Sequence, residues 1–441
     1  MSKKRLLLAA VAFHFCLCVL VLAVGRLGAL RGTFNADGVA VSFASDGVLY
    51  RQEAALLDRW ITNRGFSLWL EAPFQLHVKI YALLFKALGW LTGHTILSIE
   101  PFNALCYAAT LWLVYRLGRD AFDERAGLFA AAIVALWPSY LLHTTQFLKD
   151  PPIIAAALAF VALVSWLLKR DMTPRAALAV WAAGAALGAL LWHLRREMLL
   201  IAMAASALGL AALVVRQLRA RRWATWNSAC AAALLLTTIS TPFVIPYYRT
   251  PASLIAPTQR QFAQLKEVRA EGAEAEAARR GPAVKLTIYQ WFAIYLTSLR
   301  RESAKTADSG IDVGVKFFSL GDVFRYLPRA AVVGLFAPFP SMWLSGGGQV
   351  GRAGRLLSGA ETLMAYVLML SALVGLWGWR RNPHVYLMLG VAVFGATLLA
   401  VVIGNVGTLY RMRYPFWMLL VVLGAGGLVR VAERYRTRVS E

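Results

Sequence analysis

The chain is poor in charged residues, which make up 16% of its 441 residues, whereas soluble domains carry about 25%. Hydrophobic residues account for 59% of the chain, and the mean hydropathy is +0.58. Apolar runs of roughly 17–22 residues are separated by short basic linkers, and a helix that crosses a bilayer needs about 20 residues. Because the residues within these runs do not alternate between polar and apolar, a membrane β-barrel is excluded. The sequence therefore predicts an all-α polytopic membrane protein.

Cysteines and nucleotide-binding motifs are also scarce. The four cysteines lie within apolar runs and no Cys-x-x-Cys spacing occurs, so neither a disulfide framework nor a zinc site is implied. The sequence contains no Walker-type loop and no Gly-x-Gly-x-x-Gly motif that opens a helix. An ATP-driven pump is therefore not expected.

Acidic residues are few: the chain has 23 Asp and Glu residues but 46 Lys and Arg residues, and its net charge is +23. A balance of this kind can indicate a nucleic-acid partner. Here, however, the basic residues lie at the ends of apolar runs, where they orient helices and contact anionic lipid. Membrane lipid is the expected partner, and nucleic acid is not.

The apolar runs predict about ten spans, within a range of about nine to twelve. The basic start and apolar stretch of Met1 to Gly25 resemble a signal peptide, but the many later runs favour an uncleaved first span. With ten spans, every basic cluster between them falls on the cytoplasmic side. The predicted spans are 6–25, 100–118, 126–142, 152–168, 176–194, 198–215, 225–245, 361–379, 385–404 and 414–430.

Two apolar stretches are left out of this count. Residues 75–92 carry His77, Lys79 and Lys86 in a helical pattern, which predicts an amphipathic helix on the membrane surface. Residues 326–344 contain three prolines and are interpreted as re-entrant or interfacial. An additional span near 287–299 would keep the topology consistent if 326–344 also crossed, so both arrangements stay open.

This topology divides the chain into three parts. An N-terminal membrane module, 1–245, carries a large first outer loop at 26–99. An outer region with interfacial or re-entrant helices follows at 246–360. The C-terminal membrane helices and a basic cytoplasmic tail occupy 361–441.

The first outer loop contains Asp46, Tyr50 and Ala54 at helical spacing, with Glu53 beside them. A carboxylate at a membrane surface can act as a general base toward a hydroxyl or amine. The alternative is structural, since Ser45 or Asp46 could simply begin a helix. From the residues alone, the structural interpretation is slightly favoured.

Three further turns on the same side carry cations or other polar groups. One contains His143 and Lys149, the next Arg195 and Arg196, and the last Arg411 and Arg413. Arginine pairs well with phosphate through two parallel hydrogen bonds. Lys149 could instead neutralise Asp150, Arg195 or Arg196 could pair with Glu197, and Arg411 or Arg413 could anchor a helix end.

The order of these motifs resembles that of the GT-C superfamily of integral-membrane glycosyltransferases, especially the family-39-like branch with protein O-mannosyltransferases and lipid A aminoarabinose transferases. Asp46, Tyr50 and Ala54 match that branch's first loop, although Gly47 stands where many members have a second acid. The stretches 113–119, 125–128 and 136–139 resemble the second and third spans. Arg413-Tyr414-Pro415 resembles the Arg-Tyr element before the last span.

The resemblance implies transfer of a sugar from a polyprenyl-phosphate donor to a glycan, lipid or protein acceptor on the outer face of a bacterial inner membrane. Asp46 would be the general base. Tyr50, His143, Lys149, Arg195, Arg196, Arg411 and Arg413 are the candidates for substrate binding. No cofactor is certain, but a divalent metal at Asp37, Asp46 and Glu53 stays open, as do a diphosphate-lipid polymerase or ligase, a lipid-glycan transporter and a non-catalytic scaffold.

Overall fold

The computed structural model describes residues 2–28, 30, 33–34, 39, 41, 44–169, 171–221, 225–245, 287–304, 309–344 and 351–440. These residues form helices, with two isolated β-bridges, Phe34–Val41 and Gly310–Asn405. The predicted all-α class is confirmed. The helices are α1 (Lys3–Arg26), α2 (Ser45–Arg64), α3 (Ser67–Glu71), α4 (Leu76–Thr92), α5 (Ile96–Ala121), α6 (Glu124–Ala135), α7 (Pro138–Thr144), α8 (Asp150–Leu167), α9 (Pro174–Leu194), the 3-10 turn η2 (Arg196–Met198), α10 (Leu199–Arg219), α11 (Trp226–Val244), α13 (Ile288–Ala304), α14 (Leu320–Phe336), α15 (Pro340–Trp343), α16 (Gly351–Gly378), α17 (Pro383–Val402), α18 (Val406–Met412) and α19 (Tyr414–Ser440).

Within the described residues, nine helices are long and apolar enough to cross a membrane, and a bent pair raises the number to ten. The chain is thus an integral, multi-pass membrane protein, as predicted. The nine are α1, α5, α8, α9, α10 with its preceding 3-10 turn, α11, α16, α17 and α19. The predicted span 126–142 is not one straight helix, because α6 and α7 meet at an angle of 65°. Pro138 begins α7, and the residue before a proline is driven out of helical geometry.

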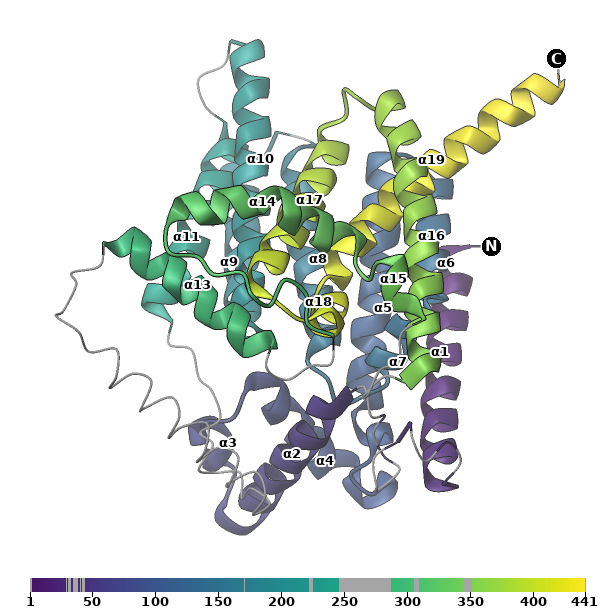
Figure 1. Ribbon diagram of the computed structural model, residues 1–441, viewed down its shortest axis with the longest axis vertical. Coiled ribbons are helices and arrows are strands. Elements are labelled where there is room, and N and C mark those ends of the chain that lie inside the picture. The colour runs from purple at the N-terminus through teal and green to yellow at the C-terminus, as the bar shows by residue number, and fades with distance from the viewer. Residues whose placement is uncertain are drawn as a thin grey trace.

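The stretches left out of the span count form shorter helices. The helix predicted at 75–92 is α4, which ends against Gly93 in a left-handed conformation with φ of 67°. Neither α13, at the stretch 287–299, nor α14 and α15, at 326–344, is among the candidate spans. In Figure 1, α14 lies across the bundle rather than along it.

Small residues let the long helices approach closely. A Cβ added to Gly118 of α5 would come within 2.8 Å of the Gly127 Cα in α6, and one added to Gly375 of α16 within 3.2 Å of the Gly427 Cα in α19. Membrane helices associate through such small-residue contacts, because lipid provides no hydrophobic drive between them. The second contact packs α16 against α19, in which Phe416 and Trp417 are buried.

The basic clusters meet at one end of the bundle. The Lys3 ammonium lies 5.9 Å from the Tyr115 ring centroid, Arg125 is 3.4 Å from Glu433, and Asn382 donates to the Ala121 carbonyl. At the other end, α2, α3 and α4 form a layer below the long helices (Figure 1). This separation agrees with the single basic side predicted from the sequence.

Arg300 and Ser309, within the region 246–360, form hydrogen bonds with the end of α17 and the residues after it. Arg300 of α13 is 1% exposed, and its guanidinium donates to the carbonyls of Ala400 and Ile311. Ser309 receives the backbone N–H of Val406 and pairs through its hydroxyl with Asn405. Residues 264–280, which are rich in alanine and charged residues and were expected to be helical, lie outside the described residues, as does most of the glycine-rich stretch 345–354.

Candidate functional site

The first turn of α2 carries Asp46 at the end of the bundle opposite the basic clusters. Ala44 occupies the N-cap position and makes no side-chain cap. The expectation that Ser45 or Asp46 begins a helix is met, because α2 begins at Ser45, but neither residue occupies the N-cap position. The Asp46 carboxylate in the first turn still benefits from the helix dipole.

Gly47 explains how α2 approaches the turn before α8. A Cβ at this position would lie 3.3 Å from the Phe147 carbonyl oxygen. A larger residue here would require the Phe147 backbone to shift by a few tenths of an ångström. The glycine thus brings the start of α2 against residues 147–150.

The guanidinium of Arg411 links two carboxylates from distant segments. Its Nη2 donates to Asp46 Oδ2 at 2.6 Å, and its Nε lies 3.3 Å from Asp150 Oδ2. The side chains of Arg411 and Asp150 are 13% and 4% exposed, whereas that of Asp46 is 44% exposed. Of these three groups, Asp46 is the one open to an incoming molecule.

The turn between α9 and α10 brings Arg195 to the same cluster. Arg195 is buried, and its Nη1 lies 3.8 Å from Asp150 Oδ1. Arg196, the next residue, pairs with Glu197 at 3.2 Å. Asp150 therefore lies between Arg195 and Arg411, two of the cations predicted from separate turns.

Lys149 lies next to this cluster, above the ring of Tyr50. Its Nζ is 5.8 Å from the Tyr50 ring centroid and donates to Gln75 Oε1 at 3.4 Å. Tyr50 also contacts the fully buried His77 edge-on, with ring centroids 4.4 Å apart. Tyr50 and Lys149, two of the residues predicted to bind substrate, are thus adjacent in space.

Electrostatics fix the charges in the cluster. Burial disfavours the ionised form of Asp46, but the charge and hydrogen bond of Arg411, with the charges of Arg195 and Lys149, outweigh burial and lower the pKa of Asp46. Burial and the charge of Arg195 lower the pKa of Lys149 to about 7. Burial and the charge of Lys149 lower the pKa of His77 well below its ordinary value. Asp46 is therefore a carboxylate at neutral pH, while Lys149 is close to its midpoint.

His143 belongs to a neighbouring hydrogen-bond network. Its Nδ1 lies 2.5 Å from the Ser139 carbonyl and 3.3 Å from the Tyr414 hydroxyl. Glu361 of α16 receives the Ser139 hydroxyl at 2.5 Å and the hydroxyl of Tyr410, the residue before Arg411. This network fixes the segment that carries Arg411.

Arg413 is placed apart from the Asp46 cluster. It is fully buried, its guanidinium carbon lies 3.8 Å from the Trp417 ring centroid, and its Nη1 donates to the Gly334 carbonyl. As for a divalent metal, no three His, Cys, Asp or Glu side chains are grouped to hold an ion among the described residues. Glu53 is buried in α2, and Asp37 lies outside the described residues.

Asp150 was not predicted as a member of the site. The sequence suggested it as a partner for Lys149, whereas the structure pairs it with Arg411 and Arg195. The Asp-Pro-Pro run could have indicated a fixed carboxylate, because a proline in the first turn makes Asp150 the start of α8. For Gln75 and His77, nothing in the sequence beyond the helical pattern of 75–92 indicated a place near the site.

Residues 79–245 match the model of the dolichyl-phosphate-mannose-protein mannosyltransferase family. This match confirms, over those residues, the resemblance predicted from the sequence. None of the curated proteins matches the chain.

Two solved structures from Archaeoglobus fulgidus are similar to the chain. The oligosaccharyltransferase in its apo form has a TM-score of 0.48 and 15% identity, with coverage of 99% of this chain and 52% of that one. The oligosaccharyltransferase AglB in complex with an inhibitory peptide and a dolichol-phosphate has a TM-score of 0.46 and 14% identity, with coverage of 96% and 51%. The chain thus spans about half the length of these structures.

Proposed function

We propose that the chain is a glycosyltransferase that moves a sugar from a polyprenyl-phosphate donor to a glycan, lipid or protein acceptor at the outer face of the membrane. The observation that carries this proposal is the contact between Asp46 and Arg411 within a cluster that also contains Lys149, Asp150 and Arg195. The family match over residues 79–245 supports the reaction class.

The partly exposed Asp46 is suited to act as the base. The acceptor hydroxyl or amine attacks the anomeric carbon of the sugar, and its proton passes to the Asp46 carboxylate. The bond between the anomeric carbon and the phosphate oxygen breaks through an oxocarbenium-like state. The bonding electrons leave with the lipid phosphate, and the configuration at the anomeric carbon is inverted.

The cations of the cluster are suited to receive the lipid phosphate. Arg411, Arg195 and Lys149 come from three different segments and lie near one another, so their charges can stabilise the negative charge that develops on the leaving group. Arg411 also holds Asp46. A phosphate that draws Arg411 away would leave Asp46 with a higher pKa and make it a better base.

The distribution of basic residues indicates on which side of the membrane the proposed site lies. The start of α2, which carries Asp46, lies at the end of the bundle opposite the N-terminus and the tail of α19 (Figure 1). Because Lys and Arg are retained on the cytoplasmic side, the site faces outward, in keeping with a bacterial inner membrane. Two alternatives can be distinguished from this proposal. A polymerase or ligase would use a diphosphate-lipid donor, and a transporter would release no free lipid phosphate.

Replacing Asp46 tests the proposal directly. Asp46→Asn keeps the size of the side chain but removes the base, and we expect kcat to fall by about 10²–10⁴-fold with membrane insertion unchanged. Release of lipid phosphate from a polyprenyl-phosphate sugar by purified protein is the measurement. Glu71→Gln, on the exposed end of α3, is the matched control and should keep full activity. An Asp46→Asn protein that transfers at the original rate would overturn the assignment.

A further inference from the structure

Two adjoining cavities open at the basic end of the bundle, away from the Asp46 cluster. Their volumes are about 300 and 390 Å³, and both are lined by Lys169 and Asp171. They lie where α5, α8 and α10 end and where α9 and α11 begin. The proposed reaction uses none of the residues that line them.

The lining carries more cations than carboxylates. Arg116, Arg119, Lys169 and Arg216 line the two cavities, against Asp120 and Asp171. Asp120 is shared by three of these cations: Lys169 at 2.6 Å, Arg119 at 3.1 Å and Arg116 at 3.8 Å. One carboxylate cannot neutralise three cations, so the cavity walls retain positive charge.

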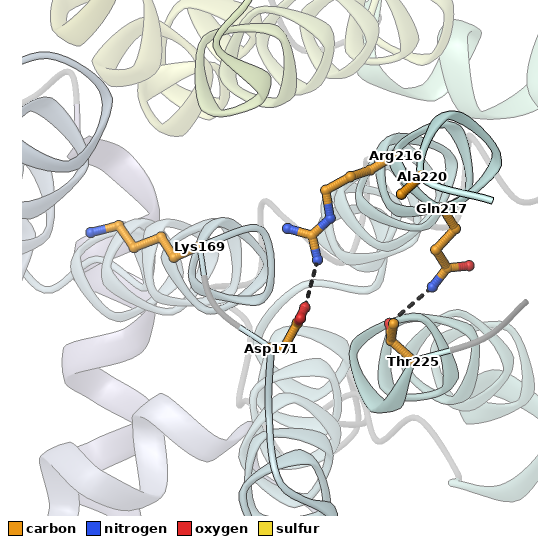
Figure 2. A pocket seen from close by; sticks show the side chains of 6 residues that line it. All are labelled: Lys169, Asp171, Arg216, Gln217, Ala220 and Thr225. Atoms are coloured by element: carbon orange, nitrogen blue, oxygen red, sulfur yellow. Dashed lines mark hydrogen bonds and ion pairs between the residues drawn. The ribbon is translucent and has the colours of Figure 1, made fainter. Parts of the chain in front are cut away.

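The fourth cation faces the first cavity. Arg216 holds Asp171 at 3.2 Å and donates to the Leu168 carbonyl. Figure 2 shows this pair beside the hydrogen bond from Gln217 to Thr225, with Lys169 pointing away from both. The second cavity is lined by Thr173, the N-cap of α9, and neither α9 nor α11 has an acid in its first turn. Both helix ends add to the positive potential.

The helices that line the cavities also carry exposed apolar side chains. Trp166 lines the second one and is 39% exposed, and the Arg116 guanidinium lies over the ring of the exposed Trp112, 5.3 Å from its centroid. Leu178 of α9 and Leu218 of α10 are also exposed. Tryptophans of this kind mark the level of lipid headgroups, and the leucines offer a surface for acyl chains.

We infer that these cavities bind the phosphate of an anionic glycerophospholipid, whose acyl chains lie along α9 and α10. Basic pockets between membrane helices are suited to anionic headgroups. A soluble phosphate would meet the same cations but would gain nothing from the tryptophans and leucines. This site is separate from the one proposed for the polyprenyl donor.

Native mass spectrometry of the purified full chain, titrated with phosphatidylglycerol or phosphatidylcholine, tests the inference. We expect phosphatidylglycerol to bind at least about tenfold more tightly. The triple variant Arg116→Gln, Lys169→Gln, Arg216→Gln should lose roughly fivefold in affinity per cation, on the order of a hundredfold in total. The matched control Arg381→Gln, Arg434→Gln, Arg436→Gln removes as much charge from the same end and should bind as the wild type does.

Each other outcome has a defined meaning. Equal losses in the triple variant and its control would indicate diffuse attraction and overturn the site. Inorganic phosphate that binds as tightly as phosphatidylglycerol would overturn the lipid assignment. If the triple variant does not fold, Lys169→Gln alone should lose about fivefold, with Lys169→Arg restoring binding, and an unchanged affinity in Lys169→Gln would refute the inference.

Discussion

Arg411 and Arg413 are two residues apart yet have different surroundings. Arg411 reaches Asp46 and Asp150, whereas Arg413 is fully buried against Trp417. Two residues on a helix are separated by about 200° around its axis, so both side chains cannot face one site. The sequence showed two cations in one turn, but which of them faces the carboxylates depends on where α18 ends.

Lys149 should make donor binding depend on pH. Because its pKa is lowered to about 7, it is charged below that pH and loses its charge as the pH rises. We expect the dissociation constant of the polyprenyl-phosphate donor to increase between pH 6 and 8.5, as measured by titration of the purified protein. Lys149→Arg, which stays charged, should remove most of this dependence. The same pH profile in both proteins would show that another group is responsible.

At the scale of the element, α18 is a short helix that presents Arg411. Its N-cap, Asn405, accepts the backbone N–H groups of Gly407 and Thr408 and the hydroxyl of Ser309. A seven-residue helix is not stable by itself. The position of Arg411 therefore depends on this cap, and on Arg300, which fixes the preceding end of α17.

Removing the cap should affect the reaction more than the fold. Asn405→Ala leaves two backbone N–H groups without their acceptor and should cost about 1 kcal/mol of stability. We expect kcat to fall about tenfold because Arg411 is held less firmly, while thermal unfolding shifts only slightly. Asn405→Asp retains an acceptor and should restore most of the rate. If kcat falls in proportion to the loss of thermal stability in both Asn405→Ala and Asn405→Asp, the role of Asn405 is purely structural.

The elements were predictable to different degrees. Long apolar runs identify spans such as α17 and α19, because bilayer thickness fixes their length. The bend between α6 and α7 had a visible cause in Pro138, yet the apolar run across it suggested a single helix. The role of the region around Arg300 and Ser309 was not predictable, since it depends on carbonyls about a hundred residues further along.

For the whole molecule, the sequence predicts one active end and one basic end. In a protein without the exposed Cys16, Thr408→Cys should react with a membrane-impermeant maleimide added outside intact cells, and Arg434→Cys should react only after the membrane is opened. The reason is that the basic tail stays in the cytoplasm. Labelling of Arg434→Cys from outside would reverse the topology and place the Asp46 cluster on the inner face.

The convergence of separate turns on one site was only partly predictable. The sequence placed the acid of the first loop and the three polar turns on one side of the membrane, and the structure brings Asp46, Lys149, Arg195 and Arg411 together. The sequence could not show which cation pairs with which carboxylate, because residues as far apart along the chain as Asp46 and Arg411 leave no local sequence pattern when they form an ion pair. Asp150 is the clearest example.

The contact between Asp46 and Arg411 has a consequence for biosynthesis. Asp46 enters the membrane region with the first helices, but Arg411 is translated hundreds of residues later, just before α19. The paired site therefore cannot exist in a nascent chain that has not yet reached Arg411. A ribosome-bound intermediate would hold an acid without its arginine, and catalytic competence would begin only when α18 and α19 have docked.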